Sequence, residues 1–315
     1  MTSGDDTIIT RDPQYRQTLL EKLRQTMGVG TRRTGIHVSD LILCTRKAWA
    51  ERVSEFTQNV SDQTILIWLR GLSHEELAAD GIQQVRSGYC FPCSENWALG
   101  DFYFDGDDPS PRCPRCQEVL LTGTIDWVID DGSPVEFKST MKSSRKHVDE
   151  GEMAWFVDQV KSYMAMHGKQ EGRIAVLHNM GDYSRADRDV RGDGPQAELV
   201  VYTVRWRSQH DPKNWLGRLA WRKARVEDDA VTPPLDENSP AHPFICEYCI
   251  VGEMLPDGSE CEKWPWELAP SGQYVRKGSG KGQVIQLDDM LGELIEMSQR
   301  QTEAELEASG DVPMA

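Results

Sequence analysis

Long apolar runs are missing from this sequence: no stretch approaches the roughly 20 residues of a membrane-spanning helix. The first residues, Met1 to Thr10, are polar and acidic, so they lack the pattern of a secretory signal. Both absences lead us to expect a cytoplasmic protein. With 315 residues, the chain can bury a substantial core as one elaborated domain or as two small ones.

Basic residues are also scarce, since 35 Lys and Arg stand against 51 Asp and Glu, for a net charge of −16. Taken alone, this balance argues against nucleic-acid binding, because phosphate contacts need Lys and Arg. Net charge is a surface average, however, and one basic track is enough. Candidate tracks are Arg32-Arg33, Lys142 to Lys146, and the stretch from Arg205 to Arg225. In the last stretch Trp206, Trp215 and Trp221 either stack on bases or pack in the core.

Eight cysteines are present, and cysteines of a cytoplasmic chain rarely form disulfides, so metal binding is the first explanation. Cys90-Phe-Pro-Cys93 and Cys113-Pro-Arg-Cys116 are two C-x-x-C motifs separated by 19 residues. Together they predict the tetrahedral four-cysteine Zn²⁺ site of a zinc ribbon. The alternative is a set of unpaired buried thiols. The ribbon is expected to be structural, although it could also contact DNA or a partner protein.

Hydrophobic periodicity and turn residues predict alternating helices and strands. Ser39 is the expected N-cap of a helix that runs through Val53. A turn at Asp131-Gly132-Ser133 separates two expected strands, 119–129 and 134–140. The other expected strands are 173–177 and 198–206, and the other expected helices are 15–26, 62–85, 151–167, 212–227 and 288–307.

The expected hairpin carries the residues with the clearest chemistry. Side chains alternate along a strand, so Asp126, Glu136 and Lys138 can share one face. The odd positions, Ile125, Trp127, Ile129, Val135 and Phe137, then form an apolar face against a core. The carboxylates and the backbone carbonyl of Phe137 suit Mg²⁺ or Mn²⁺, and Lys138 suits a water or a developing phosphate charge. The competing interpretation is an ordinary hairpin with a solvated charged face.

Three motifs in order resemble the signature of RecB-like nucleases in the PD-(D/E)xK superfamily. They are G-x-x-D at Gly123–Asp126, E-x-K at Glu136–Lys138, and Q-x-x-x-Y at Gln159–Tyr163. The resemblance implies that Gln159 and Tyr163 lie beside the metal and the DNA, and their i, i+4 spacing puts them on one helical stripe. It also implies an upstream histidine ligand on a helix, for which His74 is the best match.

The remaining cysteines are Cys44 and, much later, Cys246, Cys249 and Cys261. This arrangement, with Val38-Ser-Asp-Leu-Ile-Leu-Cys44, resembles the iron–sulfur nucleases, among them the CRISPR-associated RecB-like exonucleases and AddB-type helicase–nuclease subunits. The resemblance implies a [4Fe–4S] cluster that clamps the two ends of the nuclease domain. The 11 residues between Cys249 and Cys261 exceed the usual spacing. A second zinc ion on these thiols is the main alternative.

The expected fold class is α/β: a restriction-endonuclease-like mixed sheet flanked by helices, with an inserted zinc ribbon and an Fe–S-clamped helical region. The expected division is 1–35 lead and short helix, 36–87 N-terminal helices, 88–117 zinc ribbon, 118–227 nuclease core, 228–265 cysteine region, and 266–315 polar helix and tail. The expected function is metal-dependent cleavage of DNA, by an exonuclease on single strands or ends, with helicase or CRISPR adaptation proteins as partners. Alternatives are a DNA-binding adaptor and an iron–sulfur and zinc scaffold that docks proteins.

Overall fold

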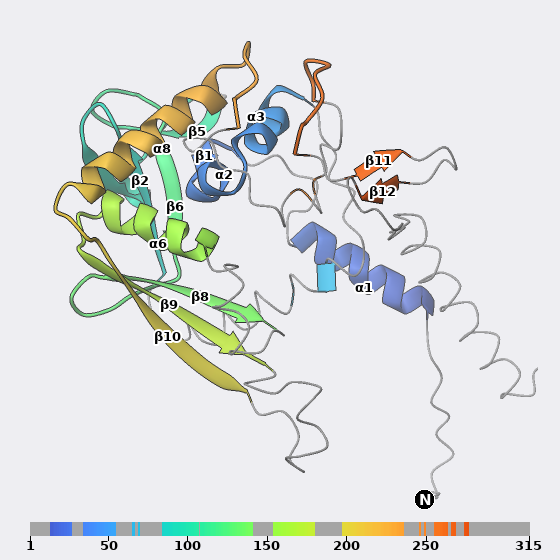
Figure 1. Ribbon diagram of the computed structural model, residues 1–315, viewed down its shortest axis with the longest axis horizontal. Coiled ribbons are helices and arrows are strands. Elements are labelled where there is room, and N and C mark those ends of the chain that lie inside the picture. The colour runs from blue at the N-terminus through green and yellow to red at the C-terminus, as the bar shows by residue number, and fades with distance from the viewer. Residues whose placement is uncertain are drawn as a thin grey trace, which may run out of the picture. The chain divides into compact units, whose positions relative to one another are not determined.

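The computed structural model describes residues 13–26, 34–54, 65–66, 69, 84–106, 108–140, 154–179, 197–235, 246, 249, 255–263, 266–268 and 274–276. The chain divides into two units, Met1–His242 and Pro243–Ala315. The first unit is a mixed α/β fold, shown in Figure 1. No helix among the described residues is long and apolar enough to cross a membrane.

Two four-stranded sheets form the framework of the first unit. One has the order β1-β6-β2-β3, with strands Ile36–His37, Leu121–Ile125, Val85–Cys90 and Glu95–Ala98. The other has the order β10-β9-β8-β7, with strands Glu198–Arg205, Glu171–His178, Pro134–Thr140 and Trp127–Val128. β8 and β9 are parallel, so the chain must cross over between them, and α6 (Ala154–Met166) lies in that crossover.

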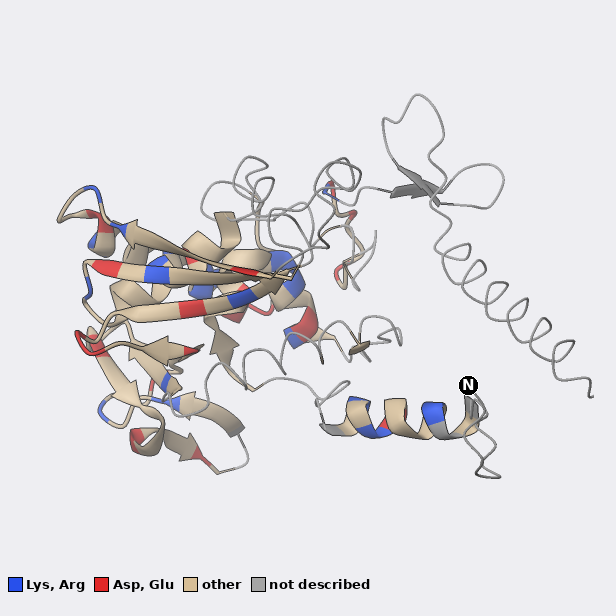
Figure 2. Ribbon diagram, turned by 90° about the horizontal axis from the view of Figure 1, so that it is seen from below, with Lys and Arg blue, Asp and Glu red and all other residues tan. Residues whose placement is uncertain are grey.

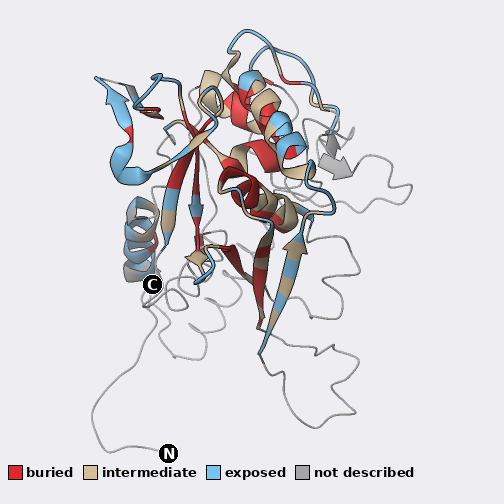
Figure 3. Ribbon diagram, turned by 90° about the vertical axis from the view of Figure 1, so that its left-hand side faces the viewer, coloured by how far each residue is buried: buried red, intermediate tan, exposed pale blue. Residues whose placement is uncertain are grey.

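Helices cover the sheets and form the core with them. Apolar side chains at helical spacing in α6, including Phe156, Val160 and Met164, are buried and pack with Ile174 and Val176 of β9. Each such buried side chain contributes about 1.5–3 kcal/mol. α6 also packs on α8 (Asp211–Glu227), which in turn contacts α3 (Thr45–Val53). Figure 3 shows the buried residues concentrated where these helices meet the strands.

A capping contact and a bend at Cys44 determine where the helices after β1 begin and end. The N-cap of α2 (Val38–Leu43) is His37, two residues before the expected N-cap Ser39. The backbone N–H of His37 donates to Asp40 Oδ2 at 2.8 Å. Cys44 has an extended backbone, with φ −161° and ψ 112°, and therefore separates α2 from α3. The expected continuous helix is thus two helices. α1 (Pro13–Thr26) matches its prediction closely.

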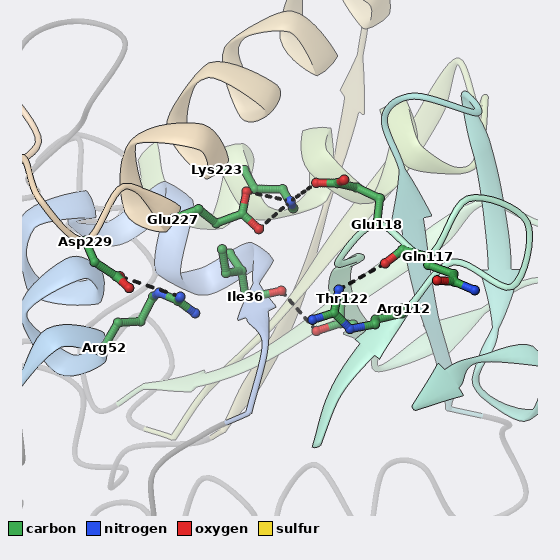
Figure 4. Close-up of polar contacts among 9 residues, drawn as sticks. All are labelled: Ile36, Arg52, Arg112, Gln117, Glu118, Thr122, Lys223, Glu227 and Asp229. Atoms are coloured by element: carbon green, nitrogen blue, oxygen red, sulfur yellow. Dashed lines mark hydrogen bonds and ion pairs between the residues drawn. The ribbon is translucent and has the colours of Figure 1, made fainter. Parts of the chain in front are cut away.

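The cysteine ribbon shares a strand with the first sheet. Its first strand, β2, is also the antiparallel neighbour of β6 in that sheet. Short strands β4 (Tyr103–Asp105) and β5 (Asp108–Arg112) and a 3-10 turn at Leu99–Asp101 complete it. Lys223 of α8 ties it to the helices, lying 3.6 Å from Glu118 and 2.6 Å from Glu227 (Figure 4). His167, at the end of α6, adds hydrogen-bond contacts to Ser87 and Asn96.

Several predicted elements lie outside the described residues. These are most of helix 62–85 and all of helix 288–307, while Val85 itself begins β2. The second unit contains a hairpin of β11 (Trp266–Leu268) and β12 (Tyr274–Arg276), which the sequence did not predict. Within the first unit, residues of both charge signs are interspersed along the strands and helices, as Figure 2 shows.

Candidate active site and cysteine cluster

Asp126 lies where the two sheets of the first unit meet. The chain bends at this residue, so β6 before it pairs in one sheet and β7 after it pairs with β8 in the other. The expected single strand over 119–129 is therefore divided. The backbone N–H of Phe137 on β8 donates to Asp126 Oδ2 at 2.8 Å. This hydrogen bond fixes the carboxylate beside β8.

Glu136 and Lys138 stand two residues apart on β8 and share one face of the strand. Lys138 Nζ donates to Glu136 Oε1. The Glu136 side chain is 1% exposed and that of Lys138 is 17% exposed. Nζ also lies 5.6 Å from the centroid of the Trp155 ring on α6, a cation–π distance. The charged face is therefore enclosed by protein, which is unlike the solvated face of an ordinary hairpin.

The apolar residues behind these charges belong to two clusters rather than one. Val135 and Phe137 pack with Trp127 and Ala175, whereas Ile125 belongs to the separate core of the first sheet. Ile129 is 36% exposed, so the expectation that it is a core residue is wrong. The bend at Asp126 explains the division, because it sends the chain from one sheet to the next.

The third predicted motif approaches the first from α6. Gln159 Nε2 donates to the hydroxyl of Tyr163 at 3.2 Å. The Tyr163 ring lies flat against β6: a Cβ added at Gly123 would be 2.6 Å from Tyr163 Cε1. Real contacts of this kind are at least 3.0 Å, so only glycine fits beneath the ring.

A cavity of about 620 Å³ brings these residues together. All five residues predicted for catalysis line it: Asp126 from the bend, Glu136 and Lys138 from β8, and Gln159 and Tyr163 from α6. The other lining residues were not predicted as site residues, although Gly123 and Thr124 belong to the first motif: Thr34, His37, Val38, Ser39, Arg86, Gly123, Thr124 and Trp155. His74 lies outside the described residues, so its predicted ligand role stays a prediction.

His37 is fixed in the wall of this cavity. The Thr122 hydroxyl donates to the carbonyl of Ile36 at 3.1 Å (Figure 4), and its oxygen lies 3.0 Å from His37 Nδ1. His37 Nε2 lies 3.2 Å from the carbonyl oxygen of Thr34. Both ring nitrogens of His37 therefore already have polar contacts within the protein.

The two carboxylates make the cavity a fitting place for a cation. Burial raises the pKa of Asp126, and the nearby Lys138 ammonium and the Phe137 N–H only partly offset that increase. Two buried carboxyl groups, Asp126 and Glu136, thus line the cavity together with the Lys138 ammonium that contacts Glu136. Carboxylate oxygens are the ligands that Mg²⁺ and Mn²⁺ prefer, so the donor set fits such an ion.

The four ribbon cysteines form a compact ligand group. Their sulfur atoms all lie within 4.8 Å of one another, with Cys90 Sγ 3.4 Å from Cys116 Sγ and Cys93 Sγ 3.9 Å from Cys113 Sγ. The residue after each C-x-x-C, Ser94 or Gln117, has a positive φ of 54° or 63°. The two motifs therefore have the same backbone turn and face one another. This group could hold a zinc ion or an iron–sulfur cluster.

The pKa of Cys113 suits a metal ligand. Burial by itself would raise the pKa of Cys113, but backbone hydrogen bonds from Cys116 and Arg115 and the neighbouring thiols of Cys90 and Cys116 together lower it to about 7. Burial raises the pKa of Cys90 and of Cys93 in the same group. Metals bind the thiolate form. The backbone turn of the second motif thus supplies donors for a negatively charged sulfur.

The other cysteines are divided between the two units. Cys44 belongs to the first, and Cys246, Cys249 and Cys261 belong to the second, so a cluster shared by all four stays a prediction. Within the second unit, the backbone N–H of Cys249 lies 3.4 Å from the carbonyl of Cys246. The extra residues before Cys261 include a tight turn at Leu255–Ser259, in which Leu255 is buried, the residues after it are exposed and Gly258 has φ 80°.

The tryptophans of the expected basic track contact protein. Trp215 is buried, its Nε1 donates to Ser162 Oγ at 3.0 Å, and Lys161 lies 4.4 Å from its ring centroid. Trp206 is partly buried and donates to the carbonyl of Lys169 at 3.1 Å. The interpretation that the tryptophans pack in the core therefore holds for Trp215, whereas Trp206 is only partly buried. Trp221 is also partly buried, with Arg225 5.4 Å from its ring centroid.

Comparison with known proteins assigns no family. No protein-family model matches the chain, and neither does any curated protein. One solved structure, titled "Crystal structure of SSO0001", is similar over 75% of this chain and 93% of that chain, with 16% identity and a TM-score of 0.42. A likeness this distant assigns neither family nor function. The chain is a mixed α/β protein with a four-cysteine group that could bind metal.

Proposed function

We propose that this chain is a metal-dependent DNA nuclease with a restriction-endonuclease-like core of the RecB-like, PD-(D/E)xK type. The observation that carries the proposal is the cavity in which residues of three separate motifs converge. Asp126 and Glu136 are buried there beside an ammonium group. Burying two carboxylates together is costly unless a cation compensates them, and this cost favours a functional site over a structural one.

The proposed roles follow from the contacts. Asp126, Glu136 and the carbonyl of Phe137 would hold Mg²⁺ or Mn²⁺, which when bound polarises a phosphate and lowers the pKa of a water. The Lys138 ammonium, oriented by Glu136 and the Trp155 ring, stabilises negative charge on the phosphate. The hydrogen-bonded pair Gln159 and Tyr163 positions the substrate at the cavity wall.

The ribbon cysteines are proposed to hold a structural zinc ion rather than an iron–sulfur cluster. The matched positive-φ turns and the backbone donors to Cys113 support a closed tetrahedral site. Cys44, Cys246, Cys249 and Cys261 are proposed to hold a [4Fe–4S] cluster. We propose that the substrate is single-stranded DNA or a DNA end, and that a helicase or CRISPR adaptation protein supplies it.

An anaerobic nuclease assay tests the proposal. Wild type, Lys138→Ala and Lys22→Ala are incubated with end-labelled single- and double-stranded DNA and Mg²⁺ or Mn²⁺. Lys22 is an exposed residue of α1 that lies outside the cavity and the candidate basic tracks, so its variant is the matched control. Loss of degradation with Lys138→Ala alone, and with EDTA, is the expected result. If folded wild type leaves every substrate intact, the nuclease proposal is wrong and a DNA-binding adaptor becomes the better account.

A further inference from the structure

Arg86 is a cation in the cavity that the proposed reaction does not use. It lies on β2, the strand that leads into the ribbon, four residues before Cys90. β2 pairs antiparallel with β6, and Arg86 is directly opposite Thr124, which also lines the cavity. Asp126 is two residues beyond Thr124, a separation of about 7 Å along a strand. Arg86 therefore stands on the neighbouring strand, close to the proposed metal-binding carboxylate but displaced from it.

The environment of Arg86 differs from that of Lys138. Lys138 is largely buried and contacts Glu136. Arg86 is exposed and lines the cavity, and among the residues that the structure describes no carboxylate forms an ion pair with it. Its charge is therefore available to a ligand that enters the cavity. The following residues of β2, from Ser87 to Cys90, are buried and hold the strand in place.

A phosphate group is the ligand that this position favours. A guanidinium presents planar paired donors that match two phosphate oxygens, and its charge does not titrate near neutral pH. The carboxyl groups of Asp126 and Glu136 already line the cavity, and they repel an incoming phosphate unless a cation is nearby. Arg86 supplies that cation at the point where the strand pair enters the cavity.

We propose that Arg86 binds a phosphate of the DNA strand next to the one that is cleaved, so that the first strand of the cysteine ribbon forms part of the substrate-binding wall. This inference rests on the proposed nuclease function. It gives the ribbon a role beyond support, because Cys90 ends the same strand and Ser87 joins it to His167 at the end of α6. A metal ion bound by the ribbon cysteines would thus hold β2, the strand that carries Arg86, in position.

Binding and cleavage are measured separately to test it. The probe for binding is fluorescein-labelled oligo(dT), followed by anisotropy without added Mg²⁺ or Mn²⁺. Arg86→Ala is expected to weaken binding roughly ten- to hundred-fold, the usual effect of losing a charged hydrogen-bonded contact. The slope of log affinity against log salt concentration should fall by about 0.7, the value for one phosphate of a single strand. Arg86→Lys restores charge but not the paired donors, so it should recover the slope and only part of the affinity.

Arg16→Ala is the matched control, because Arg16 is an exposed arginine of α1 outside the cavity and outside the candidate basic tracks. In cleavage assays Arg86→Ala is expected to raise KM far more than it lowers kcat, with an unchanged melting temperature. If wild type cleaves DNA and Arg86→Ala matches Arg16→Ala in affinity, slope and KM, the phosphate role of Arg86 is overturned and the nuclease proposal stands. If wild type binds without cleaving and Arg86→Ala weakens binding, the nuclease proposal is overturned and the role of Arg86 stands. If wild type neither binds nor cleaves, both are overturned.

Discussion

Replacing Gly123 with alanine tests how the first and third motifs fit together. The added Cβ would lie 2.6 Å from Tyr163 Cε1 and 3.2 Å from Val38 Cγ2, whereas ordinary contacts lie at 3.4–4 Å. The ring cannot retreat freely, because Tyr163 is 4% exposed and its hydroxyl bonds to Gln159. Relief therefore requires a shift of α6, which carries Gln159 and Trp155 on the cavity wall.

The expected cost combines two opposing effects. Overpacking of a well-filled core costs about 1–3 kcal/mol. Alanine also restricts the unfolded chain, which returns about 0.4–1 kcal/mol. Overpacking is the larger, so the melting temperature should fall by roughly 2–10 °C for a unit of this size. A displacement of about 1 Å near reacting groups costs on the order of 100-fold in rate, so kcat should fall by about that factor.

Scanning calorimetry and the nuclease assay measure the two effects, with Gly88→Ala as the matched control. A Cβ at Gly88 would lie 2.8 Å from Leu120 Cδ1, a similar overlap, but Gly88 does not line the cavity and the side chains it would press on are not on α6. The control variant is expected to lose about as much stability as Gly123→Ala but much less activity. Adding Tyr163→Leu to Gly123→Ala should recover stability but not activity, whereas Tyr163→Phe should recover neither. Wild-type stability and activity in Gly123→Ala would refute the steric argument.

Two further predictions concern the buried charges and the cysteines. The raised pKa of Asp126 means that its contribution to stability is fully present below its unfolded pKa and is lost as pH rises through the folded pKa. Asp126→Asn should therefore raise the melting temperature of metal-free protein near neutral pH, with little effect in acid, while abolishing cleavage; equal shifts at both pH values in calorimetry would contradict this. Cys113→Ser should remove close to one equivalent of ribbon-bound metal, measured by elemental analysis, and lower the melting temperature, because structural metal binding is coupled to folding. Unchanged metal content would show that the four sulfurs are not a shared site.

The sequence predicted local features of the first unit better than its long-range ones. Strands β8, β9 and β10 and helices α1, α6 and α8 follow from periodicity and capping within their own segments. Ile129 was assigned to the core because alternation was assumed to continue through Asp126, where the chain instead bends between sheets. A bend of this kind depends on which strands pair, and β2 and β6 are more than 30 residues apart.

The residues of the cavity show the same difference between local motifs, which the sequence reveals, and strand pairing, which it does not. Asp126, Glu136, Lys138, Gln159 and Tyr163 were found because each belongs to a short motif with a recognisable spacing. Arg86 and His37 had no such motif around them and enter the cavity only through the pairing of β2 and β1 with β6. A cation four residues before the first cysteine of a C-x-x-C motif, on the same strand, was the one local signal that could have drawn attention to Arg86.

The position of Asp126 between the sheets has a consequence for nascent and partly unfolded chains. Glu136 and Lys138 belong to the second sheet, but Asp126 is aligned with them only where β6 has joined the first sheet and β7 has joined β8. A chain with only one sheet formed therefore lacks a complete set of the carboxylates that we propose to bind metal. In the nuclease that we propose, hydrolytic capacity would arise only with the finished fold, and incompletely folded copies would be harmless to DNA.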